Sequence, residues 1–598
     1  MINIIPTPKK ITAAEGTFNL QNAYITVPDN ADRRVVSAAA KLSREMTKAA
    51  KTLVPLTAKE KSNGCISVSH KNGVGEGYFL KISENMIEIM SESAAGAFYA
   101  IQSLRQLVLE NGENLPCCTV EDEPDFPVRG FYQDITRGRV NTLKKLKDIV
   151  DLLSYYKVNS LQLYVEDAFL FKEFEGILTE DEAMTAEEMT ALDSYCREHF
   201  IELVPSLSTF GHLFTLLQSE KYHYLSEFPD HKMTANYWME KQWHHTVNVY
   251  HPDTEKVIGS MIEQYIPLFS SDKFNICCDE TMDLCRGVNA GCDKEEAYFR
   301  HVMKLVNIVK SHGKTVLLWG DECMAHPEKS KELLPEDTVV LNWCYHKTVP
   351  EWIPKFFSDL GIKQIVCPGT SSWSHFIEDT NESIGNITDF AAYGKKYGAL
   401  GLLNTNWGDF GHICSFNCNL YGTLFGAQKS WNVDSKTDGE FTKSASFLLY
   451  GVTEFDMTET VAALCKAEKS CDWFRYVMWH SATHLEGREA ELHYNKEAGL
   501  TEKDAIEGIA TCEKEIEKLR SLDRTGDARI DDVILSAEAI ALMERLYLLK
   551  NSVPGYTDAK ELQKDFNSWL ERYKKAWLRD DKPSQLPRLA EFIEHITE

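Results

Sequence analysis

The sequence has no apolar stretch of about 18 residues, the length that a helix needs to cross a bilayer, so we expect no transmembrane helix. It has no run of five basic residues, and 90 Asp and Glu against 64 Lys and Arg give a formal net charge of −26. This balance argues against nucleic acid or an anionic membrane as a partner. The first residues, MINIIP, show no basic region followed by a long apolar run, so no signal peptide is expected.

Paired cysteine motifs are missing as well. The 16 cysteines form no CxxC pair and no spacing typical of a zinc finger. Scattered cysteines in a long chain usually act as small buried apolar side chains. We therefore predict free thiols, no bound metal ion and no cofactor. Reduced thiols are more typical of the cytoplasm than of an oxidising compartment, so we expect a cytoplasmic location.

The chain of 598 residues, 43% hydrophobic and 26% charged, has the composition of a globular protein. Single hydrophobic cores stop growing at roughly 250–300 residues, so we expect several domains. Residues 1–122 mix short strands and helices, 123–435 alternate strands with helices, and 436–598 are helical in pattern. We therefore predict a non-catalytic N-terminal α+β domain, a central α/β domain and a C-terminal helical domain.

In the first region, short β-like runs indicate strands and apolar residues at helical spacing indicate helices. The predicted strands are 23–27, 65–68, 78–82 and 86–90, and the predicted helices are 33–49 and 94–109. The acidic segment EDEPDFP at 121–127 carries two prolines and is predicted to be a linker.

The central region suits a (β/α)8 barrel, because eight short apolar strands alternate with amphipathic segments over roughly 300 residues. The predicted strands are 128–134, 160–165, 201–207, 274–278, 315–319, 338–342, 363–368 and 400–404, with helices such as 142–156, 186–200 and 294–311 between them. A doubly wound open sheet is the alternative, although no GxGxxG motif follows any of these strands.

The C-terminal region contains long charged segments of helical period at 502–522, 531–551 and 559–577. They predict an antiparallel helical module. Its apolar stripe, which includes Val533, Ile540 and Leu548, has to be buried, so we expect these helices to pack on the barrel as a scaffold. Self-association into a homodimer is also compatible with this pattern.

Residues that bind or react follow every predicted barrel strand. In chain order they are Arg137, Glu166 and Asp167, His212, Asp279 and Glu280, Trp319 and Asp321, Trp343 and Tyr345, Trp373, and Trp407 and Asp409. The loops after the strands of a barrel build its active site. Aromatic faces stack on sugar rings, and carboxylates and Arg bind hydroxyl groups. The set therefore predicts a carbohydrate site.

Each of these residues also has a purely structural interpretation. A Trp at a strand end commonly packs in the core, Glu166 and Asp167 could cap a helix, and His212 could be a buried histidine with its hydrogen bonds satisfied. The Asp279-Glu280 pair is the strongest candidate. It follows the apolar strand FNICC directly, with no exposed loop before it.

Taken together, the motifs of residues 1 to about 435 resemble glycoside hydrolase family 20, the β-N-acetylhexosaminidases. The similar segments are IIPTPKKIT (4–12), RGFYQDITRGR (129–139), LQLYVED (161–167), FGH (210–212), CDE (278–280) and NWGD (406–409). Two positions depart from the family. Cys277 and Cys278 stand where Gly-Gly is usual, and Ser371-Ser372-Trp373 stands where a Tyr that binds the acetamido group is common. Tyr345 is one candidate for that role.

The resemblance implies a retaining exo-β-N-acetylhexosaminidase that removes terminal non-reducing β-linked N-acetylglucosamine from a glycan or glycoconjugate, with N-acetylgalactosamine as an alternative terminal sugar. The substrate's own acetamido oxygen attacks the anomeric carbon and forms an oxazolinium intermediate. Glu280 is then the general acid and base, and Asp279 holds the acetamido N–H. Two adjacent carboxyl groups are expected to raise the pKa of Glu280 and keep it protonated.

The remaining roles follow from the same resemblance. Arg137 and Asp409 bind the outer hydroxyl groups of the sugar. The pocket walls are Trp319, Trp343, Tyr345, Trp373 and Trp407, while His212, Asp167 and Glu166 support the Asp-Glu pair from behind. Two alternatives stay open: an N-acetyl-sugar hydrolase that releases a disaccharide, of the lacto-N-biosidase type, and a catalytically silent sugar-binding barrel.

Overall fold

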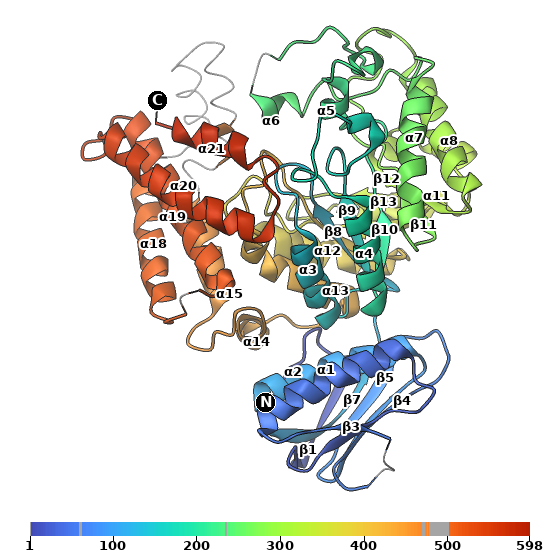
Figure 1. Cartoon of the computed structure of the whole chain (residues 1–598), viewed down its shortest axis with the longest axis vertical. Helices are drawn as coiled ribbons and strands as arrows, with labels where there is room; N and C mark the ends of the chain where they lie inside the picture. The colour runs from blue at the N-terminus through green and yellow to red at the C-terminus, as the bar shows by residue number, and fades with distance from the viewer. Residues whose placement is uncertain are drawn as a thin grey trace.

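The structure is a computed structural model that describes residues 2–58, 62–233, 236–468, 473–474, 476–477, 501–524 and 526–597. Figure 1 shows three parts: a sheet with two helices at the N-terminus, a central barrel, and a group of long helices toward the C-terminus. Among the described residues, no helix is both long and apolar enough to span a bilayer.

The N-terminal part is a seven-stranded sheet with two helices packed on one face (Figure 1). Its elements are β1 (Lys10–Asn19), β2 (Tyr24–Thr26), β3 (Leu56–Thr57), β4 (Cys65–His70), β5 (Tyr78–Ile82), β6 (Met86–Ser91), β7 (Asn114–Asp122), α1 (Arg33–Ala50) and α2 (Ala94–Asn111), with strand order β1-β7-β5-β6-β4-β2-β3. The sequence pattern misses β1 because that strand is almost wholly exposed. The predicted linker is wrong in part, since Glu121 and Asp122 belong to β7.

A buried ion pair joins this sheet to the barrel. Lys157 Nζ, just before β9 (Ser160–Tyr164), lies 3.2 Å from Asp122 Oδ2, and both side chains are fully buried. Trp431, the last residue of α13 (Leu420–Trp431), donates its indole N–H to Asp122 Oδ1 at 2.9 Å. Burial lowers the pKa of Lys157, and the charge of Asp122 opposes that shift. The N-terminal domain therefore rests against the amino-terminal ends of the barrel strands, away from the edge where chemistry is expected.

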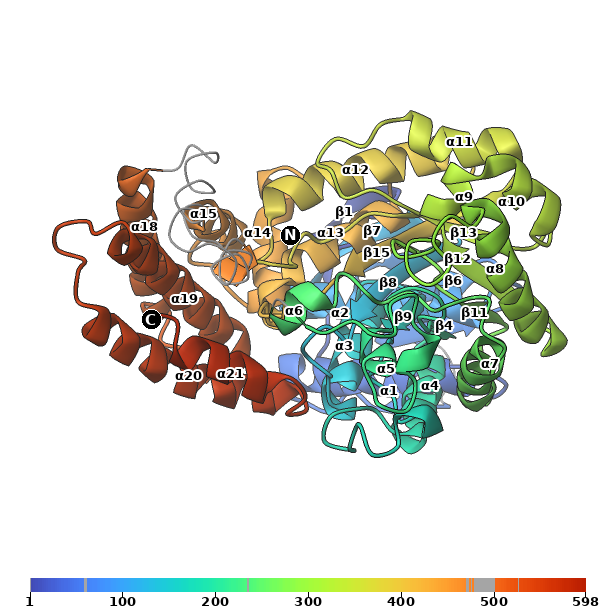
Figure 2. The ribbon, with the colours of Figure 1, turned by 90° about the horizontal axis from the view of Figure 1, so that it is seen from above.

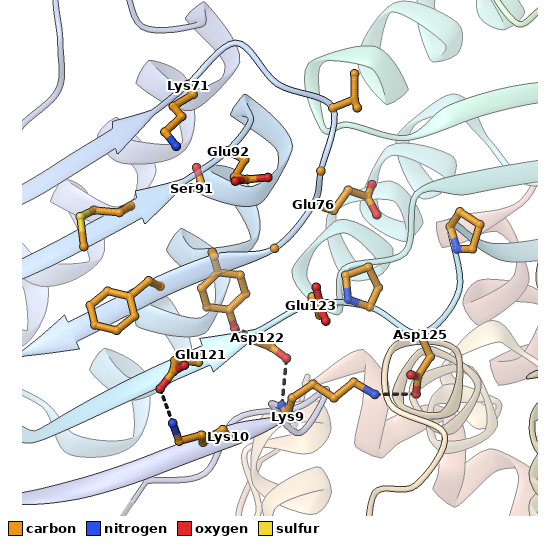
Figure 3. A pocket seen from close by; sticks show the side chains of 18 residues that line it. Lys9, Lys10, Lys71, Glu76, Ser91, Glu92, Glu121, Asp122, Glu123 and Asp125 are labelled. Atoms are coloured by element: carbon orange, nitrogen blue, oxygen red, sulfur yellow. Dashed lines mark hydrogen bonds and ion pairs between the residues drawn. The ribbon is translucent and has the colours of Figure 1, made fainter.

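A cleft of about 1170 Å³ opens beside this junction, along β5, β7 and the segment 123–127 (Figure 3). The side chains that line the cleft are mainly acidic, but lysines in the lining neutralise part of this negative charge. Lys9 Nζ lies 2.6 Å from Asp125, and Lys10 Nζ lies 2.5 Å from Glu121. These pairs connect β1 to the chain that enters the barrel, so the cleft is part of the domain junction.

The central part is a barrel of eight parallel strands, which confirms the predicted fold. The strands are β8 (Val128–Asp134), β9, β10 (Glu202–Pro205), β11 (Lys273–Asn275), β12 (Thr315–Trp319), β13 (Val339–Trp343), β14 (Lys363–Cys367) and β15 (Gly401–Asn406). β8, β9 and β10 pair with one another in chain order, and so do β11 to β15. β15 in turn pairs with β8. A bridge between Ser206 and Asn275 closes the ring between β10 and β11. This order excludes a doubly wound open sheet.

Helices surround this ring, as the alternating pattern predicts. They are α3 (Leu143–Tyr155), α4 (Ala186–Glu198), α7 (Thr254–Tyr265), α8 (Lys294–Ser311), α10 (Pro327–Leu333), α11 (Trp352–Leu360), α12 (Thr380–Lys396) and α13. The connection from β10 to α7 is much the longest loop at this edge, and it carries the short helices α5 (Phe214–Leu217) and α6 (Tyr237–Glu240).

The C-terminal helices pack on the barrel, as expected from their apolar stripe. Among the described residues they are α14 (Gly439–Tyr450), α15 (Met457–Ala467), α18 (Glu502–Arg520), α19 (Ala528–Lys550), α20 (Ala559–Asp580) and α21 (Leu586–Glu594). Figure 2 shows them gathered on one side of the barrel. Buried Arg139 pairs with Asp581 at 2.5 Å. The guanidinium of Arg588 in α21 lies 3.7 Å from the ring centre of Tyr237 in α6. The helical module therefore also supports the loop after β10.

The cysteines are not all free, which corrects the sequence-based prediction. Cys285 and Cys292 form a disulfide with their Cα atoms 5.2 Å apart. The loop between β11 and α8 turns back on itself, and the N–H of Gly291 donates to the carbonyl of Cys285 at 3.1 Å. A pair seven residues apart has no signature spacing, so only the turn reveals it. The other described cysteines are free, and almost all are buried.

Candidate active site

Asp279 and Glu280 lie at the carboxy-terminal edge of the barrel, just beyond β11. The predicted strand at 274–278 is shorter in the structure because Cys277 and Cys278 have left-handed backbones, with φ of +58° and +65°. Such conformations are costly for residues other than glycine and persist only where the surroundings hold them. They turn the chain so that Asp279 and Glu280 leave the strand at the barrel mouth.

Hydrogen bonds from residues of β12 and α8 hold this turn. The N–H of Trp319 donates to the carbonyl of Cys277 at 3.0 Å, and Tyr298 Oη donates to the carbonyl of Cys278 at 3.0 Å. Glu280 also has a positive φ, +47°, and its N–H donates to Asp321 Oδ2 at 3.0 Å. Asp321 thereby positions the backbone of Glu280.

His212, on the loop after β10, lies between the two carboxylates. Its Nε2 is 3.2 Å from Glu280 Oε2 and 3.5 Å from Asp279 Oδ2. The preceding residue must be glycine, because a Cβ on Gly211 would stand 2.7 Å from the carbonyl oxygen of Asp279. The ring of His212 stacks on that of His245, with centroids 4.6 Å apart. The backbone N–H of His212 donates a hydrogen bond to His245 Nδ1 at 2.8 Å.

Glu280 does not have the raised pKa expected from its neighbour Asp279. Burial alone would raise the pKa of Glu280, but the hydrogen bond and charge of His212, helped by Arg137, lower it to about 2. Burial alone would lower the pKa of His212, but Asp279 and Glu280 raise it to about 10. In the ligand-free protein the proton therefore resides on His212. The expectation was wrong because the sequence shows Asp279 beside Glu280 but not the imidazole that the fold inserts between them.

Arg137 is held by carboxylates from three strand ends. Its Nη1 lies 3.1 Å from Asp409 Oδ1 and 3.4 Å from Asp134 Oδ2, and its Nε lies 3.6 Å from Glu166 Oε1. Asp134 is fully buried and also accepts hydrogen bonds from the N–H groups of Arg137 and Gly408, at 3.1 and 2.9 Å. It thus fixes the relative positions of Arg137 and the loop that carries Asp409.

Glu166 and Asp167 share a buried lysine that the sequence analysis does not single out. Lys241 Nζ, on the loop after β10, lies 2.8 Å from Glu166 Oε2 and 3.5 Å from Asp167 Oδ2. Thr215 donates a further hydrogen bond to Asp167. Burial alone would raise the pKa of Glu166, but Lys241 and Arg137 lower it to about 2. Glu166 supports Arg137, whereas Asp167 anchors the β10 loop.

The predicted aromatic residues come together across the barrel mouth. Trp319 and Trp407 are buried with ring centroids 5.5 Å apart, and Trp343, Tyr345 and Trp373 are half-buried beside them. Tyr345 stacks on Trp343 at 5.3 Å and meets Trp373 edge-on at 5.1 Å. These five rings form one apolar cluster with residues of the barrel interior. They make a continuous aromatic wall.

Tyr345 is placed to act as a polar group in this wall. Trp407 Nε1 donates to Tyr345 Oη at 2.7 Å. Burial raises the pKa of Tyr345 well above its ordinary value, and the charge of nearby Asp279 adds to the shift. Tyr345 therefore remains a neutral phenol whose oxygen accepts the indole N–H of Trp407.

Lys241, His245 and Asp321 support the site. Asp321 is visible in the sequence after the fifth strand, but nothing there separates it from the adjacent Glu322. Lys241 and His245 lie in the part of the long β10 loop that follows the FGH motif, where we recognise no further motif, so no sequence signal identifies them. His212, Asp279 and Glu280 also have ligand atoms within 4.8 Å of one another, a spacing that suits a cation.

Comparisons with known proteins agree with this geometry. Residues 1–123 match the model of glycosyl hydrolase family 20, domain 2, and residues 126–391 match that of the family's catalytic domain. The chain belongs to glycoside hydrolase family 20. The two matches together cover the N-terminal sheet and most of the barrel, which agrees with the resemblance carried by the strand-end motifs.

Relatives and solved structures of the family differ in how much they share with this chain. A β-hexosaminidase of Porphyromonas gingivalis is 24% identical over an alignment of 363 positions that covers 54% of this chain and 45% of the relative. The chain thus spans about half the length of that relative. Flavobacterium johnsoniae chitobiase superposes with a TM-score of 0.64 at 17% identity and covers 95% of this chain and 96% of its own. An exo-β-N-acetylglucosaminidase of Vibrio harveyi, solved with N-acetylglucosamine, gives a TM-score of 0.59 at 18% identity over 75% of this chain and 78% of its own.

Replacing Lys241 by Met should destabilise the protein strongly. The change leaves Glu166 and Asp167 buried without their shared cation, and losing one partner of a buried pair costs about 3–5 kcal/mol. The control Lys144→Met breaks an exposed pair with Asp148 (2.9 Å) and should cost no more than about 1 kcal/mol. Urea unfolding of the two variants and the parent measures both changes. Equal losses in the two variants would contradict the buried network.

The proton on His212 should make stability depend on pH. Because the pKa of His212 is raised to about 10 in the folded state, its ionic stabilisation is complete below about pH 6.5 and is lost as pH rises toward 10. The difference in unfolding free energy between the parent and His212→Gln should therefore shrink between pH 6 and pH 9.5. Denaturant unfolding across this range tests the trend, with His312→Gln, an exposed histidine on α8's C-terminal side, as control. A constant difference would show that His212 is not protonated.

Proposed function

We propose that the protein is an exo-acting β-N-acetylhexosaminidase that hydrolyses terminal β-linked N-acetylglucosamine from glycans by substrate-assisted catalysis. The observation that carries this proposal is the group formed by Asp279, Glu280 and His212 at the mouth of a family 20 barrel. One carboxylate can serve as acid and base, the other can hold the acetamido N–H, and a single proton is stored between them. Names of relatives in the family, such as the Vibrio harveyi exo-β-N-acetylglucosaminidase, support the same activity.

The catalytic cycle begins with a proton transfer. When a sugar enters the mouth it displaces water around Glu280, which makes the charged carboxylate less favourable and raises its pKa. The proton then passes from His212 Nε2 to Glu280 across 3.2 Å. His212 becomes neutral, and Glu280 becomes a general acid next to the glycosidic oxygen.

Bond cleavage uses the substrate's own nucleophile. The acetamido oxygen attacks the anomeric carbon while Glu280 gives its proton to the leaving oxygen, and an oxazolinium ion forms. Asp279 accepts the acetamido N–H and offsets the positive charge that develops there. Glu280, now a carboxylate, removes a proton from water as the water opens the oxazolinium, so the sugar is released with its configuration retained.

The rest of the mouth recognises the terminal sugar. Arg137 and Asp409, paired at 3.1 Å, are placed to bind its outer hydroxyl groups, and the aromatic wall is placed to pack on its apolar face. We assign to Tyr345, a neutral phenol within the aromatic wall, the hydrogen bond to the acetamido oxygen that family members commonly make with a Tyr after the seventh strand. Arg137 and Asp409 suit equatorial hydroxyls at positions 3 and 4, so we favour the gluco over the galacto epimer.

A second function deserves a test because the neighbouring loops set the depth of the mouth. A lacto-N-biosidase-type enzyme would use the same Asp279 and Glu280 but accept a disaccharide. Release of N-acetylglucosamine as a monosaccharide from chito-oligosaccharides supports the exo-enzyme, and release of intact disaccharides supports the alternative. No turnover of either substrate would point to a silent sugar-binding barrel.

Replacing Glu280 by Gln should lower turnover by about 10²–10⁴-fold on substrates with poor leaving groups, the usual contribution of an acid or base. Aryl glycosides with acidic leaving groups should lose less in the first step, because they need little protonation. Rates on a series of aryl N-acetylglucosaminides of increasing leaving-group pKa measure this trend. A loss that is equal across the series would remove Glu280 from the role of acid.

The acetamido group should be essential to the rate. A 4-nitrophenyl β-N-acetylglucosaminide should be cleaved, whereas the matching β-glucoside, which has a hydroxyl in place of the nucleophile, should be essentially inert. Asp279→Asn should lower kcat more than it raises KM, because the charge that Asp279 opposes develops in the transition state. Comparable rates on the two aryl sugars would mean that the protein supplies the nucleophile.

A further inference from the structure

The long loop after β10 contains a second cluster of polar side chains, separate from the catalytic pair. His231, Glu240 and His244 each offer one ligand atom, and these atoms lie within 4.8 Å of one another. His231 Nε2 lies 2.6 Å from Glu240 Oε2, and the side chain of Glu240 is only 4% exposed. The two imidazoles lie against each other, with ring centroids 3.7 Å apart.

The state of His244 is unusual for a side chain in a loop. Its Nδ1 is buried and finds no hydrogen-bond partner among the described residues. Its backbone has a left-handed φ of +57°. A buried nitrogen without a partner is costly, and a bound ion would satisfy it.

The donor set defines the class of ion. Two imidazoles and one carboxylate suit Zn²⁺ and its transition-metal neighbours, whereas Ca²⁺ and Mg²⁺ prefer oxygen ligands alone. Three protein ligands leave one position of a tetrahedral site for water. The imidazole planes are inclined to each other by 26°.

The position of the cluster suggests what the ion does. Glu240 directly precedes Lys241, which neutralises Glu166 and Asp167, and His244 directly precedes His245, on which His212 stacks. An ion held by Glu240 and His244 would therefore fix both residues that the β10 loop contributes behind the catalytic pair.

We infer that His231, Glu240 and His244 form a structural site for a divalent transition-metal ion, with zinc as its natural class of ligand, that fastens the β10 loop over the barrel. The ion takes no part in bond cleavage. The inference does not depend on the proposed activity, because the site can be filled or emptied whatever the barrel hydrolyses.

The test measures zinc itself. The full chain without an affinity tag is stripped of metal by a chelator and titrated with ZnCl₂ by calorimetry near pH 7.5. We expect one equivalent of zinc per chain and a rise in Tm on binding. His231→Gln and His244→Gln should each weaken binding by more than about 100-fold, since even partners outside the coordination sphere contribute about 10–100-fold. The control His312→Gln, which removes a partly exposed imidazole paired with Glu263, should bind zinc as the parent does.

A further variant separates this cluster from the catalytic one. His212→Gln should leave the zinc equivalent intact. Zinc that is lost in His212→Gln but kept in His231→Gln and His244→Gln would place the ion at Asp279 and Glu280 and overturn the inference, as would a parent chain that binds no zinc. Should the two loop variants fail to fold, the visible spectrum of the parent with Co²⁺ decides the matter: intense four-coordinate bands support the site, and a spectrum like that of aqueous Co²⁺ refutes it.

Discussion

A carboxylate is expensive to bury unless a cation lies against it, and this constraint organises the mouth of the barrel. The strand ends deliver acidic side chains from every side to one small area. Arg137, His212 and Lys241 are the cations that make their burial tolerable, and each is shared between two or more carboxylates. The carboxylates around Arg137 come from three different strand ends. The loops are therefore positioned by charge as much as by packing.

The same charge balance prepares the site for catalysis. A carboxylate that must act as an acid has to obtain a proton at neutral pH, and isolating it in an apolar pocket is one way to do so. Here an imidazole with a raised pKa lies between two carboxylates. In the mechanism that we propose, its proton becomes available when a sugar changes the solvation of Glu280, so the arrival of substrate is coupled to the acid state of Glu280.

Much of the fold and of the candidate site could be predicted from the sequence, because the sequence signals for them are local. Apolar runs separated by amphipathic segments indicate the barrel, and residues that follow directly after strands, such as Asp279 and Trp319, must lie at its mouth. The failures concern contacts between distant segments. Lys241 lies far beyond the FGH motif of its loop, in a stretch without a recognisable pattern, and the pKa of Glu280 depends on His212, which is 68 positions away in the chain. The early end of β11 depends on backbone angles that cysteine rarely adopts, so a residue-type pattern cannot reveal it.

The junction between Asp122, Lys157 and Trp431 has a consequence for how the chain unfolds. Asp122 precedes the first barrel strand, Lys157 precedes the second, and Trp431 ends the last barrel helix, so one carboxylate connects the sheet to both ends of the barrel sequence. If the sheet domain opened alone, the Lys157–Asp122 ion pair and the hydrogen bond from the Trp431 indole would both be lost. Separate unfolding of the two units is thereby disfavoured, so we expect the sheet and the barrel to unfold together.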